Sequence, residues 1–138
     1  LYLLGTMNSA DQGVFPLDSA FRRRWSFEYI GYKTPCLYDD NDKTLLYGGE
    51  SINWDLLRSK INKSLAALGV HEDKLIGPYF LTTKELTEPK SIQNKLFLYL
   101  WDDVLRFQRS ELMAFDSFAD LIEEWRDGNG SPLKIEVY

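Results

Sequence analysis

The sequence has little cysteine and histidine, and it has no long apolar run. Cys36 is the only cysteine, so the chain cannot form an internal disulfide, and a single thiol is typical of a reducing compartment. His71 is the only histidine, and one histidine far from one cysteine lacks the spacing of a metal site. No stretch is long and apolar enough to span a membrane, and no signal-peptide pattern is present. We therefore expect a cytoplasmic protein without a metal site or a membrane segment.

A phosphate-binding loop is also missing. Such a loop reads G-x-x-x-x-G-K-[ST], and the sequence contains no Gly-Lys pair. No apolar strand ends in adjacent acidic residues that could hold Mg²⁺. The two acidic pairs fall in a predicted loop at Asp39–Asp40 and on a predicted helix at Asp102–Asp103. By itself, the chain is therefore expected neither to bind a nucleotide tightly nor to hydrolyse it.

The charge balance is acidic, with a formal net charge of −5. This argues against a nucleic-acid clamp, because counterion release needs a basic face. At 44% hydrophobic and 14% aromatic residues, the chain can build the core of one domain. The local exception to the acidic background is the run Arg22, Arg23 and Arg24.

The first residues predict a buried strand. Leu1–Leu4 is a continuous apolar run, which suits a strand of a parallel sheet that is covered on both faces. The polar residues from Gly5 onward end the strand. Ligands of open α/β sheets lie beyond the carboxyl ends of strands, so Asn8 is placed where its amide could meet a phosphate or a water. One strand cannot form such a sheet, and we expect the chain to be the C-terminal fragment of a longer protein.

A short helix and a second strand are predicted next. Asp18 can cap the helix, since a carboxylate accepts hydrogen bonds from the free N–H groups of the first turn. The three arginines then fall in its last turn, where cations suit the helix dipole. Trp25 and Phe27 alternate with polar residues, which is typical of a short strand.

These segments together resemble a known family. LLGTMNSAD followed by LDSAFRRRWSF is similar to the sensor 1 strand and arginine-finger helix of AAA+ ATPases, in particular the McrB-like branch of modification-dependent restriction systems. The resemblance implies that Asn8 is sensor 1, which helps to position the attacking water, and that Asn8 and Asp11 contact the nucleotide. It also implies that Arg23 and Arg24, together with Arg22, act as fingers on the neighbouring subunit's nucleotide. One departure is Gln12, where the family usually has arginine, so any role of that arginine is lost or replaced here.

The chemistry fits those roles. Phosphoryl transfer depends mostly on positioning and charge stabilisation, and a guanidinium supplied by a neighbour meets the charge that develops. The resemblance implies that the full-length protein uses ATP or GTP with Mg²⁺, and none is expected on the fragment. It further implies a homo-oligomeric ring of subunits, a McrC-like nuclease partner, and DNA contacts through other domains. The sequence cannot choose between ATP and GTP.

Two other functions remain open. The chain could be a stand-alone helical protein-interaction domain whose arginine run docks an acidic partner, or it could bind nucleic acid through the same arginines. The acidic balance and the lack of aromatic residues among the basic ones count against the latter. Asn8 and Asp11 also match the N-x-x-D of a guanine-reading motif, which is a weak signal.

We expect an α+β fragment that is mainly α, in four parts. Residues 1–33 would be the end of an AAA+ α/β core, and residues 34–50 a linker or inserted loop, with room for a small hairpin. Residues 51–127 would form a helical lid, and residues 128–138 a tail with a short strand from Leu133 to Tyr138.

Apolar periodicity predicts three helices in the lid. The first runs from a cap at Asn53 to about Leu68 and stops at Gly69, the longest begins at Thr87 or Glu88, and the third spans Phe115 to Trp125. Between the first two lies Leu75–Leu81, which resembles the I-G-x-x-[YF]-F segment that follows the first lid helix in McrB-like proteins. Its residues 79–81 are expected to form a short buried strand.

Overall fold

The computed structural model describes residues 1–7 and 18–136, and the chain divides into two compact units, Leu1–Ile30 and Gly31–Tyr138. Among the described residues, the regular structure is mainly helical and includes one two-stranded sheet. The α+β, mainly α class predicted from the sequence is confirmed. The second unit begins at Gly31, so it includes residues 34–50, which were predicted to be a linker or inserted loop.

The first unit has no buried core among its described residues. Its one regular element there is α1 (Ser19–Arg22), and residues 1–7 and 18–30 are all exposed. The predicted strands at Leu1–Leu4 and Trp25–Phe27 are therefore wrong for this structure. A strand needs a partner for its backbone groups, and no described segment pairs with either stretch.

The second unit begins with a hairpin. Strands β1 (Thr44–Tyr47) and β2 (Glu50–Asn53) pair antiparallel, with Thr44 opposite Asn53. Gly48 and Gly49 form the two-residue turn with φ of 61° and 80°, a conformation that favours glycine. Leu45, Tyr47 and Ile52 are buried, so one face of the hairpin faces the core.

Helix α2 (Trp54–Ala67) follows the hairpin directly, and the prediction for it is confirmed. The Asn53 side chain accepts hydrogen bonds from the N–H groups of the first turn, which makes it the N-cap. The helix stops at Gly69, whose φ is 77°. Its apolar stripe, Leu57, Ile61 and Leu65, is fully buried.

Three short elements connect α2 to the longest helix. The 3₁₀ turn η2 (Glu72–Lys74) precedes an irregular segment, and α3 (Thr83–Leu86) begins with a capping box between Thr82 and Glu85. The predicted strand at residues 79–81 is wrong, because these residues form a turn. The turn buries Leu81 and leaves Tyr79 half exposed.

The longest helix is continuous from α4 (Pro89–Ser91) through η3 (Ile92–Phe97) to η4 (Leu100–Val104), and the prediction of its start is confirmed. Segments η3 and η4 have π-helical hydrogen bonding. Two adjacent apolar stripes bury one face of this helix, whereas its other face is exposed, for example at Asn94 and Asp102. The stripes consist of Ile92, Leu96, Leu100 and Val104, and of Phe97, Trp101 and Leu105.

The last elements are α5 (Arg109–Leu112), α6 (Phe118–Trp125) and the 3₁₀ turn η5 (Arg126–Gly128). Ser117 caps α6, which confirms the predicted third helix. Of the predicted terminal strand, the described part forms a single bridge between Leu133 and Met113. Residues 137–138 lie outside the described residues.

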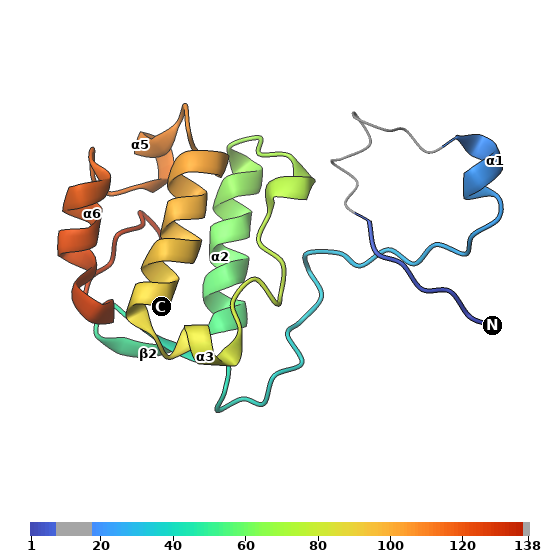
Figure 1. Ribbon diagram of the computed structural model, residues 1–138. Coiled ribbons are helices and arrows are strands. Elements are labelled where there is room, and N and C mark those ends of the chain that lie inside the picture. The colour runs from blue at the N-terminus through green and yellow to red at the C-terminus, as the bar shows by residue number, and fades with distance from the viewer. Residues whose placement is uncertain (8–17, 137–138) are drawn as a thin grey trace. The chain divides into compact units, whose positions relative to one another are not determined.

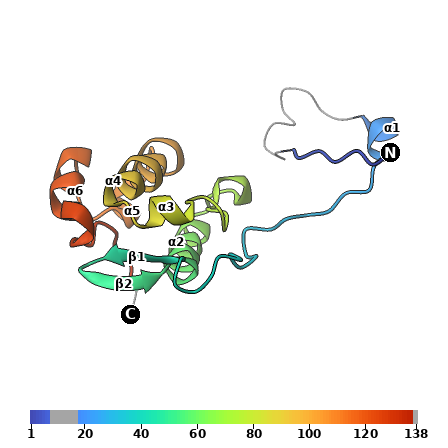
Figure 2. The same ribbon diagram turned by 60° about the horizontal axis from the view of Figure 1, so that its bottom comes forward.

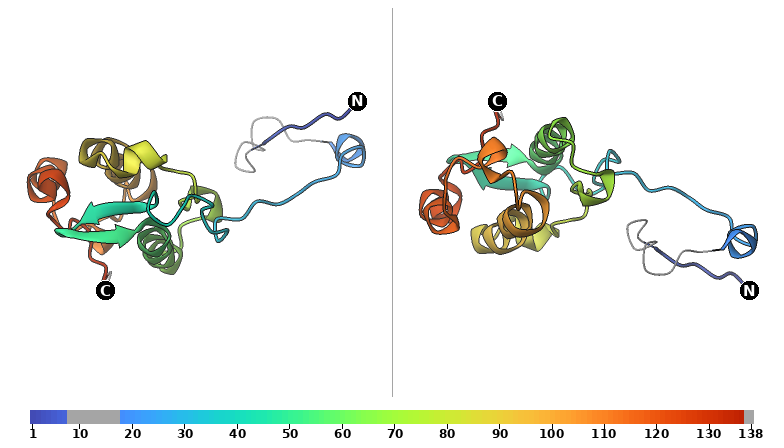
Figure 3. Two further views of the ribbon diagram at one scale, coloured as in Figure 1. Left: turned by 90° about the horizontal axis from the view of Figure 1, so that it is seen from below. Right: turned by 90° about the horizontal axis from the view of Figure 1, so that it is seen from above.

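In the second unit, α2, the longest helix and α6 run side by side, and the hairpin crosses their ends (Figures 1 and 2). Figure 3 views these helices close to end-on and shows β1 and β2 lying between α6 and α2. Trp125 joins the layers: its ring centroid is 5.8 Å from that of Tyr47 and 4.8 Å from that of Phe97. Its indole Nε1 donates to Pro89 O at 3.0 Å. The second unit therefore has one shared core.

Candidate functional site

The arginine run lies at the end of a tightly turned segment. Asp18 Oδ1 accepts a hydrogen bond from Phe21 N at 2.6 Å, which confirms Asp18 as the N-cap of α1. The chain then tightens, with Arg24 N bonded to Phe21 O at 3.1 Å. The rings of Phe21 and Trp25 lie 5.7 Å apart, one on each side of the arginines in sequence.

All three arginines are exposed. Arg22 makes an interaction within the chain. The guanidinium groups of Arg23 and Arg24 have no hydrogen-bond or ion-pair partner among the residues that the structure describes. Their five N–H donors each are therefore available to an anionic group from another molecule.

The remaining predicted site residues are Asn8, Asp11 and the departure at Gln12, and all lie outside the described residues.

A second polar arrangement was not predicted from the sequence: two buried polar residues on α2, Arg58 and Asn62. They lie four positions apart, next to the apolar stripe of the helix. Each bonds to backbone groups of segments that have no regular structure of their own. The sequence signal for these two residues was their position beside the apolar stripe of α2. Solvated polar residues occupy such positions as well.

Arg58 holds the start of the second unit against α2. Its guanidinium donates to the carbonyl of Tyr32, to Thr34 O at 3.0 Å and to Asp55 Oδ1 at 2.8 Å. Arg58 is 3% exposed, and its Nε is buried without a hydrogen-bond partner among the described residues. A planar guanidinium can serve several acceptors at once, which suits it to join irregular backbone to a helix.

Residues 75–81 are fixed to α2 by side chains of that helix. Asn62 forms two hydrogen bonds with the backbone of Ile76, and Trp54 Nε1 donates to Pro78 O at 2.9 Å. The Tyr79 hydroxyl accepts from Leu37 N at 3.3 Å. The segment that resembles the I-G-x-x-[YF]-F stretch is therefore a loop whose backbone is hydrogen-bonded to side chains of α2.

An aromatic pair closes the other side of this loop. The rings of Tyr38 and Tyr79 meet edge to face with centroids 5.4 Å apart, and the Tyr38 hydroxyl donates to Leu81 O at 3.4 Å. Burial raises the pKa of the Tyr38 hydroxyl above 10.0, with a smaller contribution from the nearby Cys36. Tyr38 is therefore a neutral donor at neutral pH.

Two of the hollows in the described part of the second unit differ in the charge of their lining. The first, which we call the α2 groove, has a volume of about 450 Å³. It is lined by Tyr32, Lys33, Arg58, Ser59, Asn62, Lys63 and Ala66. The second, which we call the α6 pocket, has a volume of about 320 Å³. It is lined by Phe115, Asp120, Glu123, Glu124 and Arg126.

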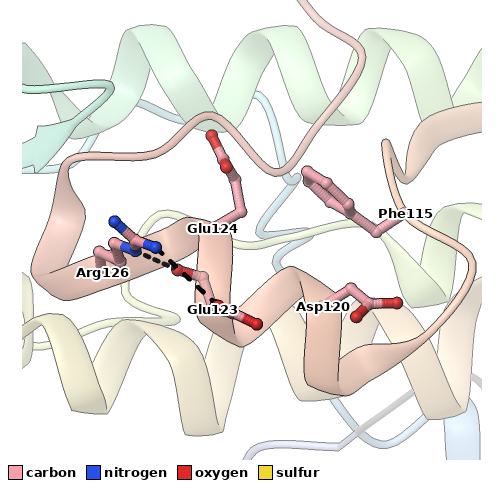
Figure 4. Close-up of a pocket in the computed structure, with 5 residues that line it drawn as sticks. All are labelled: Phe115, Asp120, Glu123, Glu124 and Arg126. Carbon is pink, nitrogen blue, oxygen red and sulfur yellow. Dashed lines mark hydrogen bonds and ion pairs between the residues drawn. The ribbon is translucent and has the colours of Figure 1, made fainter.

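The α6 pocket is acidic. Figure 4 shows its three carboxylates along α6 and Arg126 turned towards Glu123. Arg126 Nη2 lies 3.9 Å from Glu123 Oε1, and its Nε donates to Glu123 O at 3.1 Å. The single cation of this pocket is therefore engaged with one of its carboxylates.

No cluster of three or more metal-binding side chains occurs among residues 1–7 and 18–136. Within the same residues, none of the helices has the length and apolar character that crossing a lipid bilayer requires.

The chain is 40% identical over 140 aligned positions to the Type II restriction enzyme BsuMI component YdiS of Bacillus subtilis strain 168. The match covers 99% of this chain and 40% of the relative, so the chain spans less than half of the relative's length. No protein-family model matches the chain, and no solved structure matches it significantly.

Proposed function

We propose that this chain is the C-terminal part of a McrB-like AAA+ NTPase that serves a DNA restriction system. The observation that carries the proposal is the run Arg22–Arg24, exposed directly after a capped turn and following the GTMN stretch that contains Asn8. The relative's printed name, a component of a restriction enzyme, supports the same cellular role.

In this proposal, Arg23 and Arg24 reach the nucleotide of the neighbouring subunit in a homo-oligomeric ring. Their guanidinium groups are exposed and have no described partner, as a finger that acts on another molecule requires. They would stabilise the charge that develops on the transferred phosphoryl group, and Asn8 with Asp11 would contact the subunit's own nucleotide and orient the attacking water. The bound ATP or GTP with Mg²⁺ supplies the phosphoryl group and neutralises its charge.

The apolar side chains of the first unit support its assignment to a larger core. Leu1, Tyr2 and Leu4 are 97% or more exposed, and Tyr29 and Ile30 are 74% or more exposed. Such a surface favours burial, at roughly 25 cal/mol per Å² of apolar area. We propose that these residues pack in the α/β core of the full-length protein, and that residues 51–127 form its lid.

The decisive experiment measures ATP and GTP hydrolysis by the full-length protein that contains this chain. The double variant Arg23→Ala/Arg24→Ala and the single variant Asn8→Ala are each expected to lower turnover by at least about a thousandfold and a hundredfold respectively. Arg106→Ala is the matched control, because Arg106 is exposed in the second unit and its guanidinium lies over the Phe107 ring at 5.8 Å. Its turnover should match that of the wild type.

Mixing tests whether the arginines act across an interface. Subunits with the double arginine change are combined with subunits that carry intact arginines but a disabled phosphate-binding loop. Partial recovery of hydrolysis is expected, because one kind of interface then has both halves intact. Unchanged turnover in the double variant by itself would reject the arginine-finger role of Arg23 and Arg24.

A second candidate is a stand-alone interaction domain with the arginine run as its docking element. It is favoured by the second unit, which has a core of its own that extends from Cys36 to Leu133. A McrC-like nuclease partner and DNA contacts through other domains are part of the first proposal only. Binding of the chain to an acidic protein without nucleotide, abolished by Arg23→Ala/Arg24→Ala, would support this candidate.

A further inference from the structure

The α2 groove collects positive charge in a chain whose net charge is −5. Lys33, Arg58 and Lys63 line it, and no carboxylate does. The α6 pocket of the same unit has the opposite character, with three carboxylates and one arginine. The two hollows are therefore electrostatically distinct, and only the groove is suited to an anion.

Most of the charge of Arg58 is used within the fold. Asp55 Oδ1 lies 2.8 Å from Arg58 Nη2, and backbone carbonyls accept from the remaining donors of the guanidinium ends. The exception is Nε, which is buried and has no acceptor among the described residues. A buried N–H without a partner costs free energy, so an acceptor beside it is favoured.

Lys33 and Lys63 supply the surplus charge of the groove. No carboxylate of the described residues forms an ion pair with either ammonium group. Lys33 Nζ lies 5.7 Å from the centroid of the Tyr32 ring, which keeps it near the groove without neutralising it. Two uncompensated ammonium groups that face one hollow repel each other unless an anion lies between them.

The other polar groups of the groove are already engaged. Ser59 Oγ donates to Leu56 O at 2.9 Å, and the Asn62 amide is bonded to the backbone of Ile76 on both sides. An anion would therefore depend on the lysines, with the Tyr32 ring and Ala66 as apolar walls. Lysine binds a phosphate oxygen as a point charge, without a fixed geometry.

We propose that the α2 groove is a phosphate-binding site, with Lys33 and Lys63 as its ligand-contacting residues and Arg58 as the buried cation behind them. The site lies wholly in the second unit and requires neither Asn8 nor the arginine run. It therefore stands or fails independently of the proposed NTPase activity. The phosphate can be a free ion or the head of a phosphomonoester, and the groove volume of about 450 Å³ accommodates either.

The test is a titration of the 138-residue chain with inorganic phosphate and, in parallel, with glycerol 3-phosphate, followed by backbone amide NMR at constant ionic strength. Shifts are expected at the amides of Lys33, Ser59 and Lys63. Lys33→Gln and Lys63→Gln should each weaken binding about fivefold, in line with one exposed charge pair. Tighter binding of glycerol 3-phosphate than of inorganic phosphate would indicate that the organic group of the ester contacts the Tyr32 ring. Equal binding of the two would assign the site to the free ion.

The matched control is Lys60→Gln, since Lys60 lies on α2 but does not line the groove. It should bind phosphate like the wild type. Thermal unfolding of each variant checks that the lysine changes leave the fold intact. The proposal is overturned if phosphate causes no localised shifts, if all three variants respond equally, or if the acidic α6 pocket shifts as strongly as the groove.

Discussion

The side chain of Asn62 pairs with the backbone of Ile76 as a strand residue would. Asn62 Oδ1 accepts from Ile76 N at 2.8 Å, and Asn62 Nδ2 donates to Ile76 O at 2.8 Å. Both residues are buried, so these bonds are shielded from water. Through them, α2 fixes a loop whose backbone groups have no ladder to join, which satisfies the requirement that buried N–H and C=O groups be bonded.

Asn62→Ala should therefore destabilise the chain by about 1–3 kcal/mol, because it leaves Ile76 N unsatisfied, whereas Ile76 O keeps the 3.4 Å hydrogen bond from Arg58 Nη1. Urea unfolding followed by circular dichroism measures the change. Asn94→Ala is the control: Asn94 is exposed on the longest helix and should change stability by less than about 0.5 kcal/mol. Equal effects of the two substitutions would contradict the role of the Asn62 pair.

Arg58→Lys should destabilise the chain by at least about 2 kcal/mol despite keeping the charge, since an ammonium cannot serve Tyr32 O, Thr34 O and Asp55 together. The same unfolding experiment applies, with Lys60→Arg as the control on the same helix. If Arg58→Lys is as stable as the wild type, the fork geometry of the guanidinium is not what holds residues 32–34.

Gly130→Ala should prevent folding of the second unit or cost more than about 4 kcal/mol, because a Cβ at Gly130 would lie 1.8 Å from Glu124 O, a backbone atom that cannot move aside cheaply. At Gly77 a Cβ meets nothing within 4 Å. Gly77→Ala is therefore the matched substitution and should be neutral or stabilising by up to about 1 kcal/mol. Thermal unfolding of both variants tests the contrast.

Glu85 should make stability depend on pH under acidic conditions. Its pKa lies below the ordinary 4.5, first because Lys95 Nζ donates to its carboxylate and second because Thr82 N does. A lowered pKa in the folded state contributes stability above about pH 4.5 that is lost as the pH falls through the folded value. Unfolding free energy measured from pH 6 to pH 3 should fall less steeply in Glu85→Gln than in the wild type.

The control for this pH series is Glu111→Gln, which changes an exposed carboxylate on α5 and should keep the slope of the wild type. Identical slopes for wild type and Glu85→Gln would show that the Lys95 pair contributes nothing to acid stability.

Local sequence patterns predicted the helix boundaries that depend on a capping residue or on a glycine stop. Asn53 and Gly69 bound α2, and Asp18 caps α1, each as predicted. These signals depend on hydrogen bonds within a few residues, so they are readable from the sequence. Where pairing with distant segments was needed, as for Leu1–Leu4, the pattern predicted a strand that the described chain does not form.

By itself, the sequence determined the mainly helical second unit, its apolar stripes and the exposed run Arg22–Arg24. Only the tertiary structure placed Arg58 and Asn62 as buried side chains that bind the backbone of residues 32–34 and 76, and placed Lys33 and Lys63 in the lining of one groove. The reason is physical: caps and helical periodicity act over one or two turns, whereas a buried polar side chain is defined by which distant backbone groups lack other partners.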